Sequence, residues 1–258
     1  MPVWLFLLIL APVIGSFLGV IVRRLGTGQS IIWARSNCEN CGVAIAFYDL
    51  VPLVSFLQLK GRCRHCRSRI SFFHPAIEIS AILVAVWAMT VDSGNGLIAS
   101  CLLGWMLLGL ALCDIARYRL PDGLTLPLLL AGLGATAMLM PEAVADHALA
   151  AALAYGLFRT IGWLYQRLRG LAGLGQGDAK LLAASGAWLG LFALPNLILI
   201  AAASALIFAL LLKVQGRVID RQTRLPFGPF IALATWLLWL YGPQDVFKFS
   251  PYLLTVLK

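Results

Sequence analysis

Long uncharged apolar runs alternate with short polar segments along most of this chain. The first run, Val3 to Val22, contains no charged residue and is long enough to cross a bilayer as a helix. Because Arg23 and Arg24 follow it directly and no basic segment precedes it, we expect a retained anchor rather than a cleaved signal peptide. Further apolar runs predict spans near 75–91, 97–115, 124–140, 147–165, 181–194, 196–214 and 230–241. The pattern predicts an all-α polytopic membrane protein with about eight transmembrane helices.

The polar segment at residues 23–74 is the only extended one in the sequence. We therefore expect three parts, which are a first transmembrane helix at 1–22, a loop domain at 23–74 and a transmembrane bundle at 75–258. Within that bundle the run at 181–194 is short for a full crossing, so it is expected to begin in a re-entrant or interfacial stretch.

Composition and charge placement support a membrane location and give the chain a direction. Hydrophobic residues make up 61% of the chain and charged residues 12%, far below the roughly one quarter that is typical of soluble domains. With the N-terminus outside, the inner loops and Arg159 hold 18 of the 20 Lys and Arg residues. These inner loops are 23–74, 116–123, 166–180 and 213–229. We expect a multi-pass protein of a bacterial inner membrane, with both termini outside, the loop cytosolic and lipid as a partner; the charge of +9 then needs no nucleic acid.

Four cysteines of the polar loop form two C-x2-C pairs, Cys38 with Cys41 and Cys63 with Cys66, separated by 21 residues. Such pairs place two thiolates each on one tetrahedral ion, so the spacing predicts a closed structural zinc site. Two disulfides or four free thiols are the alternatives, but persistent disulfides are rare in the reducing compartment in which we place the loop, and zinc is favoured. His65 is a less favoured ligand, and Cys101 and Cys113 are expected to be apolar packing residues.

Two acids are expected to meet at the cytosolic face of the membrane. Asp114 ends an outside-to-inside span and Asp178 begins an inside-to-outside span, although 63 residues separate them. Acids at such positions are costly and usually functional. Two carboxyl groups that share a site do not ionise together easily, and an aspartic protease uses such a pair to activate water and protonate the departing amine. The pair therefore predicts the catalytic residues of an aspartic protease.

The segment around Asp178 reads Gly175-Gln-Gly177-Asp178-Ala-Lys180, a G-x-G-D motif followed by a lysine. Its glycines allow close backbone approach to an extended peptide. Structural alternatives stay open for each acid. Asp178 is also suited to a helix N-cap, and Asp114 to an ion pair with a nearby arginine, Arg117 or Arg119.

Two further acids are less favoured as catalytic groups. Asp122, in Leu-Pro-Asp-Gly, is typical of a turn or a helix start. Glu78, near the start of the second span, is expected to be partly buried and paired with a base.

Taken in order along the chain, these motifs resemble those of the type IV prepilin peptidases, which also process type II secretion pseudopilins. The resembling segments are Gly15-Ser-Phe17, Arg24-Leu25, the two cysteine pairs, Pro52-Leu-Val-Ser55, Gly61-Arg-Cys63, Pro75 with Glu78, Asp114 with Leu120-Pro-Asp122, Gly175 to Lys180, and Pro226-Phe-Gly-Pro-Phe230.

The resemblance implies a GxGD-type aspartic endopeptidase with Asp114 and Asp178 as its catalytic residues. It implies cleavage of the basic leader of a prepilin or pseudopilin after a glycine at the cytosolic membrane face. It also implies N-methylation of the new amino terminus from S-adenosylmethionine, for which the sequence itself identifies no binding residues and contains no Rossmann-type glycine fingerprint.

Two other functions remain as alternatives. A polytopic transporter or proton pathway would use the two membrane acids as a relay, although no inverted repeat is evident. A zinc-stabilised secretion scaffold would have no catalytic role for them.

Overall fold

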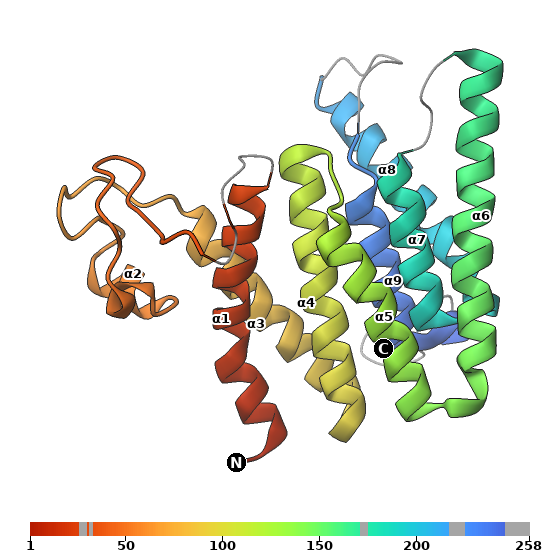
Figure 1. Ribbon diagram of the computed structural model, residues 1–258, viewed down its shortest axis with the longest axis horizontal. Helices are drawn as coiled ribbons and strands as arrows, with labels where there is room; N and C mark the ends of the chain where they lie inside the picture. Colours follow the sequence, from red (N-terminus) through yellow and green to blue (C-terminus); the bar gives the residue numbers. More distant parts are fainter. Residues whose placement is uncertain (26–29, 31–32, 171–174, 217–224, 246–258) are drawn as a thin grey trace, which may run out of the picture. The chain divides into compact units, whose positions relative to one another are not determined.

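The computed structural model describes residues 1–25, 30, 33–170, 175–216 and 225–245 (Figure 1). Within these residues the chain forms helices and isolated β-bridges but no strand. The α-helices are α1 Val3–Arg24, α2 Val54–Gln58, α3 Phe73–Val91, α4 Gly94–Arg117, α5 Asp122–Leu139, α6 Val144–Arg169, α7 Gln176–Leu189, α8 Leu194–Val214 and α9 Gly228–Asp245. Single 3-10 turns lie at η1 Phe47–Leu50, η2 Pro141–Ala143 and η3 Leu191–Ala193.

The chain divides into two compact units, Met1–Trp105 and Met106–Lys258, and the division falls inside α4. In the first unit α1 packs against α3. Gly15 makes this approach possible, because a Cβ atom there would lie 2.7 Å from the Cα atom of Glu78. The indole N–H of Trp105 donates to the carbonyl of Ala81 at 2.9 Å, which ties the first half of α4 to α3.

In the second unit α7 is the central helix, with α5, α6 and α9 packed around it (Figure 1). The indole N–H of Trp188 donates to the carbonyl of Leu128 on α5 at 2.8 Å. The hydroxyl groups of Ser185 and Thr235 join α7 to α9 at 2.7 Å. Because residues 181–188 are all buried, α7 is covered by protein on every side.

Six helices among the described residues are long and apolar enough to cross a membrane. By contrast, α7 has 14 residues and spans about 21 Å, less than a hydrocarbon core of about 30 Å. The shorter apolar segment Gly228–Gly242 of α9 precedes a break at Gly242, where φ is 76°. The prediction of an all-α polytopic membrane protein with a cysteine loop is confirmed, whereas eight spans remains a prediction. The C-terminal tail, including Lys248 and Lys258, falls outside the described residues.

Candidate metal centre and active site

The first cysteine pair lies in a knuckle closed by three backbone hydrogen bonds. The N–H of Cys38 donates to the carbonyl of Val43 at 2.9 Å, and the N–H of Gly42 donates to the carbonyl of Cys38 at 2.9 Å. The N–H of Ile45 then donates to the carbonyl of Ser36 at 2.8 Å. This turn brings the side chain of the second cysteine back toward the first.

The second knuckle repeats the same pattern at the same spacing. The backbone N–H of Cys63 donates to the carbonyl of Ser68 at 2.8 Å, and that of Arg67 donates to the carbonyl of Cys63 at 3.1 Å. The N–H of Ile70 donates to the carbonyl of Gly61 at 2.8 Å. The residue after the second cysteine has a left-handed backbone in both knuckles, with φ of 70° at Gly42 and 59° at Arg67. The two segments are therefore structural repeats, although the second lacks the glycine that this backbone favours.

The four sulfur atoms of Cys38, Cys41, Cys63 and Cys66 all lie within 4.8 Å of one another. The Sγ atoms of Cys38 and Cys66 are 3.8 Å apart. A tetrahedral zinc ion with Zn–S bonds of about 2.3 Å requires sulfur atoms about 3.8 Å apart. The residues thus fit zinc without rearrangement of the backbone, and four ligands leave no open position for catalysis. His65 is not part of the cluster.

The surroundings of the sulfur atoms favour the ionised, metal-binding form at Cys66 and Cys38 but not at Cys41. Hydrogen bonds from the side chain and backbone of Ser68 lower the pKa of Cys66 to about 6. Backbone hydrogen bonds from Cys41 and Asn40 lower the pKa of Cys38. At Cys41 the hydrogen bond from Val43 is outweighed by desolvation and the neighbouring thiols, which raise the pKa to about 11. Four thiolates this close need a cation, and a zinc ion held by Cys38, Cys41, Cys63 and Cys66 would supply that charge.

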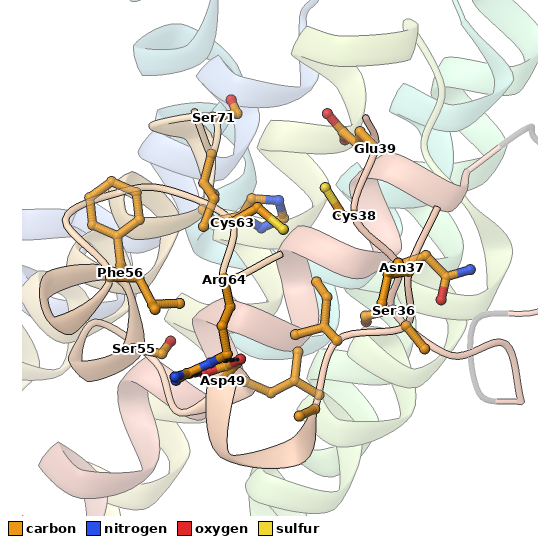
Figure 2. A pocket seen from close by; sticks show the side chains of 18 of the residues that line it. Ser36, Asn37, Cys38, Glu39, Asp49, Ser55, Phe56, Cys63, Arg64 and Ser71 are labelled. Atoms are coloured by element: carbon orange, nitrogen blue, oxygen red, sulfur yellow. Dashed lines mark hydrogen bonds and ion pairs between the residues drawn. The ribbon is translucent and has the colours of Figure 1, made fainter. Parts of the chain in front are cut away.

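A cavity of about 920 Å³ lies in the first unit, between the two knuckles and the facing ends of α1 and α3 (Figure 2). Glu78 of α3 lines it, is 5% exposed, and accepts a hydrogen bond from the N–H of Leu53 at 2.8 Å. The sequence predicted a base as the partner of Glu78. The structure corrects this, because the carboxylate instead accepts hydrogen bonds from the backbone of Leu53 in the loop and from the hydroxyl of Ser16 on α1.

The lining of the cavity also includes an ion pair between two loop residues. Arg64 donates from Nε to Oδ2 of Asp49 at 2.9 Å and from Nη2 to Oδ1 at 2.6 Å. This two-point hydrogen bond holds the pKa of Asp49 below its ordinary value. Figure 2 shows the two side chains next to each other. At the end of α1, Arg23 forms a further ion pair with Glu39 of the first knuckle. The cavity therefore has charged walls of both signs.

In the second unit, Asp114 lies near the C-terminal end of α4 and is 6% exposed. Its Oδ2 atom accepts a hydrogen bond from the N–H of Gly228 at 2.8 Å. Gly228 begins α9 within the Pro226-Phe-Gly-Pro-Phe230 segment. The backbone of Gly228 approaches the Asp114 carboxylate closely, because a Cβ atom on Gly228 would lie 2.8 Å from Oδ2.

Asp178 is the third residue of α7 and lies close enough to Asp114 for their charges to interact. The two carboxylates thus belong to one cluster. Gly175 is the N-cap of α7, so Asp178 is not the cap residue, although its carboxylate accepts a hydrogen bond from the Gly175 N–H. This contact satisfies one of the free donors at the helix start and fixes the side chain.

The other residues of the G-x-G-D segment contact the chain itself. A Cβ atom on Gly177 would lie 3.0 Å from the Cβ atom of Leu120, so this glycine allows α7 to start against the Leu120-Pro-Asp122 segment. Lys180 donates to Oδ1 of Asp122 at 2.6 Å. Asp122 is the first residue of α5, in agreement with its predicted place at a helix start. The 175–180 and Leu120-Pro-Asp122 segments, which are distant in sequence, therefore meet next to Asp178.

Two of these contacts were not predicted from the sequence, the bond from Gly228 to Asp114 and the pair between Lys180 and Asp122. The motifs that contain them could have indicated proximity, but no local pattern gives their partners. Cys101 and Cys113 are fully buried, as expected for packing residues.

The comparisons with known proteins cover nearly the whole chain. Residues 9–91 match the Bacterial Peptidase A24 N-terminal domain, and residues 101–210 match the Type IV leader peptidase family. No solved structure matches significantly.

Several similar proteins carry the name prepilin leader peptidase/N-methyltransferase. The one from Aeromonas salmonicida (strain A449) is 36% identical over 256 residues, which is 89% of this chain and 87% of the relative. The one from Burkholderia pseudomallei (strain 1026b) is 36% identical over 253 residues, covering 88% and 82%. The one from Stutzerimonas stutzeri is 31% identical over 264 residues, covering 92% and 90%. Both matched segments, and relatives aligned over most of their length, show that this chain belongs to the type IV leader peptidase family.

Proposed function

We propose that this protein is a membrane aspartic endopeptidase that removes the basic leader of type IV prepilins or type II secretion pseudopilins. The observation that carries the proposal is the cluster of Asp114 and Asp178, two buried or half-buried acids from separate helices of a family member. Cleavage would occur after a glycine at the cytosolic face of the inner membrane. In this orientation both termini lie outside, and the zinc loop is cytosolic.

The mechanism divides two roles between the acids. One carboxylate takes a proton from water, and the water oxygen then attacks the scissile carbonyl carbon while the protonated partner gives its proton to the carbonyl oxygen. The C–N bond of the resulting gem-diol breaks, and the departing amine takes the returned proton. The N–H of Gly228 occupies one oxygen of Asp114 and so fixes the orientation of that carboxyl group.

The zinc ion would have a structural role. The loop has almost no apolar core of its own, because none of residues 33–72 is buried. A metal bridge between the two knuckles supplies the stability that such a short segment lacks. Cys38, Cys41, Cys63 and Cys66 would hold it.

The second activity would be methylation of the new amino terminus, with S-adenosylmethionine as donor. We place the donor in the cavity of the first unit, since its 920 Å³ lies within the range of small-ligand sites. The carboxylates of Asp49 and Glu78 are suited to the hydroxyl and cationic groups of such a ligand. Methyl transfer to the amine would release S-adenosylhomocysteine and a proton.

The other functions are not favoured. Family membership disfavours both a proton pathway and a non-catalytic scaffold. The basic residues are assigned to orientation and to contact with anionic lipid, without a nucleic-acid partner.

Mass spectrometry tests both activities with one reaction. Purified enzyme in lipid vesicles would be incubated with a prepilin-like substrate, with and without S-adenosylmethionine. We expect a product shortened by its leader in both reactions, and an added methyl group only with the donor. An intact substrate would contradict the peptidase assignment. Donor placement has its own readout, because photo-cross-linked donor should label peptides from residues 16–24 or 34–78, which line the cavity, and labelling confined to the rest of the chain would contradict it.

A further inference from the structure

A second cavity, of about 760 Å³, opens in the second unit between α6, α7 and α8. Its walls are almost wholly apolar, with Thr160 as the one hydroxyl-bearing residue. The lining residues are Ala152, Leu153, Ala154, Gly156, Leu157, Phe158, Thr160, Leu182, Leu191, Leu194, Pro195 and Ile198. We call this space the α6–α8 groove. Neither the zinc site nor the acid pair accounts for it.

Contacts between α6 and α7 show which residues of α6 lie level with Asp178 of α7. A Cβ atom on Gly186 would lie 2.9 Å from the carbonyl carbon of Ala150, and one on Gly190 would lie 3.0 Å from Nε2 of His147. Residue numbers therefore fall on α7 as they rise on α6, so the helices are antiparallel. Both helices rise about 1.5 Å per residue. Eight residues before Gly186 on α7 and eight residues after Ala150 on α6, Asp178 therefore lies at the level of Phe158.

The groove thus begins at the level of Asp178 along the helix axis. Phe158 and Thr160 line it at the level of Asp178 or just beyond, and Ala152 and Leu153 line it farther along α6. Leu182 lines it from α7 and follows Asp178 by four residues, which places both on one face of that helix.

We propose that the α6–α8 groove binds the apolar helix of the prepilin-like substrate and thereby brings the bond before that helix to Asp178. The inference rests on the proposed peptidase function. A chain cleaved at Asp178 and continuing as an apolar helix needs an apolar path that starts at this level and runs along α6. From Asp178 to Leu189, α7 covers about 16 Å, enough for about 11 residues of a helical substrate.

The shape of the α6 wall favours a helix as occupant. Ala152, Gly156 and Thr160 recur at intervals of four residues and line the groove. Beyond its chain neighbours and the adjacent backbone of its own helix, no described atom lies within 4 Å of the place where a Cβ atom on Gly156 would be. Small residues at this interval let a second helix approach the backbone closely within a membrane. The flanking Leu153 and Leu157, 48% and 55% exposed, supply apolar contact on either side of that stripe.

A filling substitution tests the groove, with a matched glycine as control. Gly156→Leu places a branched side chain in the groove, whereas Gly134→Leu makes the same change at an open glycine of α5 that lies outside the lining. We expect kcat/KM for a substrate with its full apolar helix to fall about tenfold or more in Gly156→Leu, in line with the cost of overpacking a fitted contact. Gly134→Leu should stay within about twofold of wild type, as surface changes usually do.

Cross-linking gives a readout that does not depend on turnover. A photoreactive residue would replace Leu157 in the groove or, as control, Leu130 on α5, which is 67% exposed. The carrier would be the Asp178→Asn variant, mixed with substrate in vesicles of phosphatidylethanolamine and phosphatidylglycerol. We expect the substrate helix to be captured from position 157 and only lipid from position 130.

The outcomes separate this inference from the proposed function. If the wild type cleaves no prepilin-like substrate, the proposed function fails. If the wild type and Gly156→Leu cleave equally well, or position 157 captures only lipid, the groove assignment is overturned while the peptidase assignment stands. Equal losses in Gly156→Leu and Gly134→Leu would also overturn it, because the effect would not belong to the groove.

Discussion

The backbone N–H of Gly228 donates to Oδ2 of Asp114 at 2.8 Å, although 113 residues lie between them in the sequence. A donor from the main chain cannot rotate away as a side chain can, so it fixes one oxygen of the carboxylate and leaves the other for chemistry. This contact connects the start of α9 to the end of α4 and gives the Pro226-Phe-Gly-Pro-Phe230 segment a role in positioning Asp114.

Gly228→Ala should therefore impair cleavage without removing either acid. The added Cβ atom would lie 2.8 Å from Oδ2 and 3.2 Å from Cγ of Asp114, so the carboxylate must move. Since a displacement of about 1 Å can cost about 10²-fold in rate, we expect a loss of that order in kcat. Gly123→Ala, at an open position in the first turn of α5, is the matched control and should retain activity. Steady-state cleavage assays compare the two, and equal activity would contradict the positioning role.

Zinc removal should unfold the loop rather than abolish a catalytic step directly. We expect about one zinc per chain by metal analysis, and loss of that zinc in Cys63→Ser. Because binding to a structural site stabilises its fold by roughly 10 kcal/mol or more, limited proteolysis should then cut within residues 33–72. Cys101→Ala, at a buried cysteine outside the cluster, should keep its zinc. A metal-free wild type with a protected loop would contradict structural zinc.

The repeat of the two knuckles predicts opposite effects at equivalent positions. Arg67 has φ of 59° where the first knuckle has Gly42 at 70°. Arg67→Gly should relieve the unfavourable backbone and stabilise the zinc loop by up to about 1 kcal/mol, and Gly42→Ala should destabilise it by a similar amount. Zinc release measured against denaturant concentration reports both changes. Parallel shifts of the two variants in one direction would contradict the equivalence.

The ion pair of Asp49 and Arg64 predicts a pH-dependent difference in loop stability. The hydrogen bond from Arg64 lowers the native pKa of Asp49, so the stabilisation is complete above the unfolded value of about 3.9 and disappears as pH falls through the lower native value. Asp49→Asn should therefore be less stable than wild type at pH 7, and the difference should shrink with acidification. Thermal melts of both zinc-loaded proteins measure it, and a difference that grows on acidification would contradict the assignment.

The sequence was most informative where chemistry is local. Two C-x2-C pairs predict a four-sulfur site because each pair forms its own knuckle. The distribution of Lys and Arg residues predicts the direction of each span, and that direction predicts Asp114 and Asp178 at the same membrane face. Apolar runs likewise predict the helices, since the hydrophobic pattern directly determines which segments can enter a bilayer.

Contacts between distant segments could not be predicted in the same way. Lys180 was identified as part of a motif and Asp122 as a helix start, but their pairing depends on how α5 and α7 begin side by side. Glu78 was expected beside a base because buried acids need partners, and the partner turned out to be the backbone of Leu53. A backbone N–H leaves no mark on the sequence, so such partners become visible only in the folded chain.

Cleavage by the two aspartate variants tests the central claim most directly. Asp114→Asn and Asp178→Asn preserve shape and remove the ionisable group, while Glu142→Gln changes an exposed acid of η2 and serves as control. In vesicles with a prepilin-like substrate, mass spectrometry should find the shortened product with wild type and Glu142→Gln. Both aspartate variants should lose at least about 10³-fold in kcat, the scale expected when a catalytic acid or base is removed. Near wild-type processing by either variant would contradict the aspartic protease mechanism.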